Sequence, residues 1–227
     1  MIATKQWVYL YLALGVSLLD AQGVTYVASN PSGPAFEFIA RGDQNGDSAS
    51  TYGYLSHIDG IDDTSLFTNG AGQSPNETNA RFTIVTTLTF THRFVNANVI
   101  VGVQDETMSV YFAEFPTARD FTKPDTFAQG DVVATFHNRV QTVLNVQTPI
   151  SQQSPGMGII HATTQATQQG STVFMLGGKS YALGRIGSGF RMEATGEGTL
   201  TSASPLAAHF VFGGFAEEAN RRLFFRF

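Results

Sequence analysis

Residues 80–94 read ARFTIVTTLTFTHRF, and their side chains largely alternate between two kinds. The even-numbered positions are mainly apolar and the odd-numbered ones carry hydroxyl or charged groups (Phe82, Ile84, Leu88 and Phe90 against Arg81, Thr83, Thr87 and Arg93). Successive side chains of a strand point to opposite faces, so a period of two predicts a strand with one buried face. His92 falls on the apolar face, where we expect a hydrogen-bonded core histidine.

The same alternation continues in residues 132–147 and 190–199, although Asn138 and Thr142 interrupt the apolar face of the first segment. No stretch of 24–227 shows a sustained helical period. The runs of Thr, Val and Phe fit half-buried strands. We therefore predict an all-β protein whose strands cover 24–28, 35–41, 51–58, 80–94, 97–103, 107–115, 131–147, 157–166, 171–176, 180–184, 189–199, 207–213 and 222–227.

About a dozen antiparallel strands must bury their apolar faces against a second sheet or inside a closed barrel. Glycine-rich strand ends such as GGKSYALGRIGSGF, residues 177–190, suit the turns and corners of either arrangement. We expect residues 24–227 to form a single-domain antiparallel β-sandwich, with a closed β-barrel as the alternative.

Residues 1–23 have the features of a secretory signal peptide. Lys5 precedes an uncharged apolar run over 7–19, and the small residues Ala21 and Gly23 occupy the positions that a signal peptidase recognises. The run is shorter than the roughly 20 residues of a spanning helix. We expect a secreted, periplasmic or cell-surface protein with no membrane span after cleavage. An exported chain of this size without cysteine further favours a bacterial source.

The charge distribution argues against nucleic acid as a partner. The formal net charge is −5, and the basic residues form no cluster in 24–227. Binding to a phosphate backbone depends on clustered Lys and Arg side chains.

Residues 40–50, ARGDQNGDSAS, contain a candidate calcium site formed by the oxygen-bearing side chains of Asp43, Asn45 and Asp47. A calcium loop of the hand type starting at Asp43 requires Gly at Ser48 and Glu at Tyr54, and calcium takes six or more oxygens. Asn45-Gly46 is a strong hairpin signal. We therefore predict a polar hairpin turn here, with calcium as the weaker alternative and no other cofactor.

The last residues, 222–227, alternate and end on Phe227. This ending resembles the final strand of bacterial outer-membrane β-barrels. Such barrels need continuous lipid-facing stripes over about 9–11 residues. The interruptions at Asn138 and Thr142 argue against that reading.

The sequence contains no recognisable catalytic motif and does not identify a reaction. Our first hypothesis is an exported, soluble all-β protein with a non-catalytic binding or structural role, for which a glycan is one candidate partner. The second is a small barrel that encloses an apolar ligand, with a cyclase- or isomerase-like activity, because nineteen phenylalanines could line a cavity. The third is an outer-membrane β-barrel.

Overall fold

Eight long antiparallel strands and a small three-stranded sheet make up the structure, a computed structural model that describes residues 23–29, 32–68, 74–151 and 154–219. The eight long strands are β2 (Phe36–Asn45), β3 (Ser48–Ile58), β4 (Phe82–Asn96), β5 (Val99–Phe112), β6 (Asp131–Thr148), β7 (Gly156–Ser171), β10 (Gly189–Ala203) and β11 (Leu206–Ala219). The small sheet contains β1 (Thr25–Val27), β8 (Phe174–Leu176) and β9 (Lys179–Leu183).

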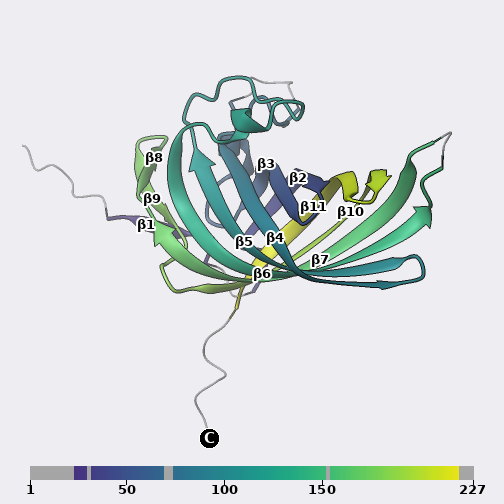
Figure 1. Cartoon of the computed structure of the whole chain (residues 1–227). Coiled ribbons are helices and arrows are strands. Elements are labelled where there is room, and N and C mark those ends of the chain that lie inside the picture. Colours follow the sequence, from purple (N-terminus) through teal and green to yellow (C-terminus); the bar gives the residue numbers. More distant parts are fainter. Residues whose placement is uncertain (1–22, 30–31, 69–73, 152–153, 220–227) are drawn as a thin grey trace, which may run out of the picture.

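The long strands close into a barrel in the order β10-β11-β2-β3-β4-β5-β6-β7. Pairing of β10 with β7, from Gly189 opposite Thr167 to Leu200 opposite Gly156, completes the ring. Figure 1 shows the small sheet at one end of the barrel and the β4–β5 and β6–β7 hairpins at the other. Closure leaves none of the eight strands with an open edge.

The prediction of an antiparallel all-β protein is confirmed. Of the two expected arrangements, the structure adopts the alternative, the closed barrel. The predicted segments 97–103 and 107–115 belong to one strand, β5, which continues through Gln104, Asp105 and Glu106. The predicted signal peptide, except for Gly23, and the strand over 222–227 lie outside the described residues.

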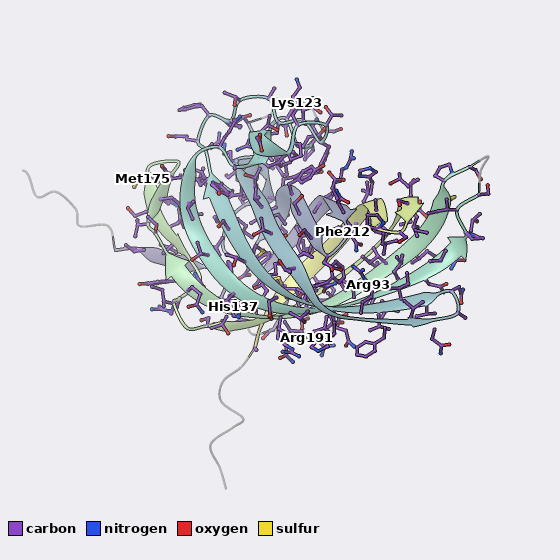
Figure 2. The ribbon with its side chains drawn as sticks, viewed as in Figure 1. Arg93, Lys123, His137, Met175, Arg191 and Phe212 are labelled. Atoms are coloured by element: carbon purple, nitrogen blue, oxygen red, sulfur yellow. The ribbon has the colours of Figure 1, made fainter. Side chains whose placement is uncertain are left out.

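The period of two in the sequence separates the inside of the barrel from its outside. Phe82 and Ile84 of β4 are buried in the interior, and so are Phe136 and Phe190 from β6 and β10. His137, which follows Phe136, and Arg191, which follows Phe190, are exposed on the outer surface (Figure 2). The apolar faces of the strands thus meet one another within the ring, where burial stabilises the fold.

Aromatic rings fill the end of the barrel beside the small sheet. The rings of Phe36, Phe136 and Phe190 lie 5.5–6.4 Å apart, centroid to centroid. A second group joins β4 and β5 to the small sheet, because Phe174 lies 5.2 Å from Phe82 and 4.9 Å from Phe112. These contacts make this end of the barrel a packed core.

The helical content is restricted to two short 3-10 helices, η1 (Asp63–Leu66) and η2 (Pro124–Phe127), within the part of the chain that the structure describes. In the described residues, no helix is long and apolar enough to cross a membrane. The segment containing η2 is bound to the outside of β3 and β4. Thr83 donates a hydrogen bond of 2.6 Å to the carbonyl oxygen of Phe127, and buried Arg119 donates one to that of Ala80.

The predicted core position of His92 is wrong. The ladder between β4 and β5 pairs Phe90 with Gln104 and His92 with Val103, so that Thr91 forms a bulge. A single extra residue reverses the two faces of a strand beyond it. His92 is consequently exposed and stacks on Phe94, whereas Arg93 from the predicted polar face lines the barrel interior.

The predicted hairpin at Asn45-Gly46 is confirmed. Asn45 pairs with Ser48, which leaves Gly46 and Asp47 as a two-residue turn, and Gly46 has a φ of +62°. Glycine adopts this left-handed conformation without a steric penalty. The strands extend further into ARGDQNGDSAS than predicted, since Asp43 and Ser50 are themselves a cross-strand pair.

Gly214 and Gly213 of β11 provide a test of interior packing. A methyl group on Gly214 would meet the carbonyl oxygen of Glu193, and would come within 2.6 Å of Phe38 Cζ and 2.9 Å of Ala194 Cβ. We expect Gly214→Ala to lower the free energy of unfolding by about 1–3 kcal/mol through overpacking. Urea denaturation measures the change.

Gly213→Ala is the matched control, because the nearest atom to its new methyl group would be the carbonyl oxygen of Phe38 at 3.7 Å. This variant should match the wild type or be up to about 1 kcal/mol more stable, since alanine replaces glycine within a strand. Equal destabilisation by both substitutions would contradict the described packing.

Candidate functional site

A cavity occupies the half of the barrel toward the β4–β5 and β6–β7 hairpins. It encloses about 1040 Å³ of space free of protein atoms, including its opening to solvent. Most of its wall is apolar, with Phe38, Met108 and Met192 on the side of the packed core and Ile100, Leu144, Ile160, Leu206 and Phe210 toward the hairpins. Such a concave, mainly apolar space is typical of small-molecule sites.

Small residues make room for this cavity. Gly42, Ala49, Gly102 and Ala162 are part of its wall. At Gly102, a methyl group would lie 2.5 Å from Phe90 Cε1 and 2.9 Å from Gln104 Nε2. The absence of a side chain at Gly102 therefore lets an aromatic ring and an amide approach each other in the wall.

One carboxylic acid, Glu106, lies deep in the wall at the centre of β5. Its neighbours across the two ladders are Leu88 on β4 and Asn138 on β6. Asn138 is fully buried, and its Nδ2 donates a hydrogen bond of 2.6 Å to Glu106 Oε1. The accessible surface that Glu106 retains belongs to the cavity that it lines.

Three further polar side chains belong to this group. Gln104 is fully buried, and its Nε2 donates a hydrogen bond of 2.8 Å to Thr142 Oγ1 on β6. Thr86 of β4 is also buried and lies opposite Met108. Together with the acid–amide pair these residues form the lumen polar cluster (Thr86, Gln104, Glu106, Asn138 and Thr142).

Three oxygen atoms of the lumen polar cluster have no hydrogen-bond partner among the described residues. They are Thr86 Oγ1, Gln104 Oε1 and Asn138 Oδ1, all inaccessible or nearly so. An unpaired buried polar atom costs about 1–3 kcal/mol, and native proteins leave few of them. All three atoms can accept a hydrogen bond, but a molecule in the cavity cannot reach them without a side-chain movement, whereas Glu106 and Thr142 keep accessible surface on the cavity wall.

Burial raises the pKa of Glu106 to about 7, from an ordinary value of 4.5. The cause is the loss of hydration, which disfavours the ionised form. The hydrogen bond from Asn138 acts in the opposite direction but is the weaker influence. Near neutral pH the cavity therefore holds a carboxyl group that can both take up and release a proton.

Arg93 lies at the end of the cavity nearest the β2–β3 turn. Its Nη2 donates a hydrogen bond of 2.9 Å to the carbonyl oxygen of Gly46, and Nη1 lies 3.1 Å from Asp47 Oδ1. The guanidinium carbon is 4.6 Å from the centroid of the Phe90 ring. Figure 2 shows Arg93 and Phe212 in this half of the barrel.

The candidate calcium ligands point to other partners in the structure. Asp43 Oδ1 accepts hydrogen bonds from Arg41 Nε at 2.9 Å and from His209 Nδ1 at 2.7 Å, and Oδ2 lies 2.5 Å from the Tyr52 hydroxyl. Burial raises the pKa of Asp43, but these hydrogen bonds outweigh it and hold the pKa below its usual value. Burial and the hydrogen bond with Asp43 raise the pKa of Tyr52.

Asp47 is bound to Arg93, and Asn45 ends β2 opposite Ser48, so the three residues do not share one centre. In the ranges that the structure describes, no three His, Asp or Glu side chains are grouped closely enough to hold a metal ion. Asp43, Tyr52 and His209 instead make a polar network on the outside of the barrel.

No family model, curated protein or solved structure matches this chain. The geometry of the site is therefore the basis for its functional interpretation.

The raised pKa of Glu106 makes stability depend on pH. Because the folded state binds the proton more tightly than the unfolded state, the free energy of unfolding should fall as pH rises from about 4.5 to about 7. Above this window the loss is complete and reaches up to about 3 kcal/mol. Chemical denaturation at pH 4 and pH 8 should show that Glu106→Gln removes this decline.

Glu114→Gln is the control, because it deletes the same charge at an exposed position just after β5. It should retain the wild-type difference in stability between the two pH values. If Glu106→Gln retains that difference as well, Glu106 does not titrate as described.

Proposed function

We propose that this protein binds a small, largely apolar molecule inside the barrel and that the lumen polar cluster hydrogen-bonds one polar group of it. The observation that carries this proposal is a mainly apolar cavity with a group of convergent polar side chains on its wall. Small-molecule sites commonly combine an apolar wall with a few placed polar groups.

The chemistry of the lumen polar cluster restricts the chemical class of the ligand. Glu106 and Thr142 keep accessible surface and line the cavity, and the oxygen atoms of both can accept a hydrogen bond. A hydroxyl or N–H group on the ligand would supply the donor. The ligand we propose is therefore an apolar molecule that carries a hydroxyl or N–H group at the end that enters first.

The sidedness of the barrel favours this function over an outer-membrane barrel. Membrane barrels turn an apolar band outward and often enclose a polar lumen. Here the phenylalanine core and the apolar cavity wall are inside. Polar side chains such as Thr87, His137, Gln165 and Arg191 are exposed outside. This arrangement fits a protein surrounded by water.

The apolar wall also favours this ligand over a glycan. Sugars present hydroxyl groups over most of their surface, whereas most of the cavity wall is apolar. Such a wall suits a mainly apolar molecule.

Binding can be tested with the fluorescent apolar amine N-phenyl-1-naphthylamine, which has one N–H group. We expect its fluorescence to rise on titration with the protein. Ala162→Phe places a ring in the cavity wall and should weaken binding by at least about tenfold, equivalent to about 1.4 kcal/mol.

Gln165→Phe adds the same ring to the exposed face of the same strand and should bind the probe as the wild type does. Equal binding by both variants would place the probe outside the barrel and contradict the proposal. Absence of binding to the wild type would also contradict the proposal.

We also propose that the protein is exported, on the basis of the apolar run over 7–19 and the small residues before Val24. When the full chain is produced in a bacterium, N-terminal sequencing of the periplasmic protein should begin at Val24. Leu14→Arg breaks the apolar run and should leave an uncleaved precursor in the cytoplasm. Cleavage at another position, or none, would contradict this part of the proposal.

A further inference from the structure

Glu106 combines three properties that suit a base. Its carboxyl group is on the wall of an apolar cavity, an amide holds one of its oxygens, and no described residue donates to the other. Asn138 Nδ2 is bonded to Oε1 at 2.6 Å, while Oε2 accepts no hydrogen bond from the described residues. Oε2 is therefore the atom available to a molecule in the cavity.

We propose that the barrel is an enzyme in which Glu106 removes a proton from a carbon acid bound in the cavity, which makes it an isomerase or an eliminating lyase for apolar substrates. This inference rests on the proposed ligand-binding function and adds a reaction to it. Glu106 would be the catalytic residue, and Asn138 a positioning residue that fixes the carboxylate.

The surroundings of Glu106 increase its strength as a base. Its cross-strand neighbour on β4 is Leu88, and Met108 follows two residues later on the same face of β5. A carboxylate in such surroundings lacks the water that weakens carboxylates in solution, which is why its pKa is raised. General bases operate best when their pKa is close to the working pH.

The same cluster can stabilise the negative charge that forms on the substrate. Thr142 Oγ1 accepts from Gln104, so its own hydroxyl hydrogen is available to a substrate oxygen. Hydrogen-bond donors fixed at the place where charge develops are a major source of rate enhancement.

The other charged residues of the cavity wall are already paired. Arg93 on β4 is bound to Asp47, and Glu193 on β10 lies 2.5 Å from Arg191. The residues of β6 that line the cavity are the uncharged Val140, Thr142 and Leu144. A pH dependence of turnover near neutrality would therefore report Glu106.

The chromogenic carbon acid 5-nitrobenzisoxazole tests this reaction without knowledge of the natural substrate. The Glu106 carboxylate takes the proton from C3 of the probe. The C–H electron pair becomes the second π bond of a nitrile, the N–O bond breaks, and its electron pair leaves on oxygen as a nitrophenolate. The proton passes from Glu106 to water, so no oxidant, reductant or cofactor is needed.

We expect the wild type to convert the probe with a kcat/KM that rises with pH and levels off above about 7. Glu106→Gln should lower kcat by at least about a hundredfold, the usual contribution of a general base. Glu106→Asp should retain part of the activity, because it keeps the carboxylate. Glu114→Gln, at the exposed site, should behave as the wild type.

Displacement of bound N-phenyl-1-naphthylamine by 5-nitrobenzisoxazole, measured for the wild type and Glu106→Gln, separates binding from reaction. If 5-nitrobenzisoxazole binds the wild type and is not converted, or if Glu106→Gln converts it equally fast, the catalytic inference is wrong and the binding function stands. If neither molecule binds, both proposals are wrong. Conversion that requires Glu106 and follows its titration establishes the reaction.

Discussion

Pairing of β7 with β10 is the constraint on which the rest of the structure depends. It closes the ring, so that one face of every long strand must point into a common interior. An open sheet with the same strands would need a second layer to cover its apolar face. Closure instead brings residues from β4, β5 and β6 around one space and separates it from the polar outer surface.

Side-chain size then decides which part of that interior is filled and which part is hollow. Beside the small sheet, the inward positions carry large rings such as Phe36, Phe82 and Phe136, and the rings of Phe36 and Phe136 lie 6.4 Å apart, centroid to centroid. Toward the hairpins, several inward positions are Gly or Ala, including Gly102 and Ala162. An eight-stranded barrel is just wide enough for side chains to fill it, so small residues leave room for a ligand.

Much of the fold follows from local sequence pattern. The alternation in 80–94 and 131–147 predicts strands with one buried face, and Asn45-Gly46 predicts a hairpin, because both depend on interactions between near neighbours. The choice between sandwich and barrel depends on whether the two edge strands of the sheet meet. Closure also requires the pairing of β2 with β11, which joins residues as far apart as Phe36 and Ala216 and leaves no local signal.

The candidate site was harder to predict, because its residues violate the pattern that identifies strands. Asn138 and Thr142 are visible in the sequence only as interruptions of an apolar face, and Gln104 and Glu106 fall where a break between two strands is expected. In the structure these four residues lie on two adjacent strands; Gln104, Glu106 and Thr142 line the cavity, and Asn138 is hydrogen-bonded to Glu106. The signal that could have found them is the coincidence of polar residues at inward positions of neighbouring strands.

The bulge at Thr91 shows a second limit of sequence reasoning. One extra residue in β4 moves Arg93 inward and His92 outward, and no residue type in the segment predicts the bulge. The network of Asp43 with His209 likewise requires the ladder between β2 and β11, in which these residues are directly opposite. Both features depend on register, which only the assembled barrel determines.

The lumen polar cluster lowers the stability of the fold at a place that apolar side chains could have filled. Apolar residues of similar size at Gln104, Glu106 and Asn138 would continue the packing found beside the small sheet and would remove two unpaired acceptors and a desolvated carboxyl group. Burial of such groups without a packing benefit is typical of sites where function opposes stability. A cavity and a carboxylic acid with a raised pKa at one place have a common explanation if a ligand occupies the cavity and pairs with Glu106.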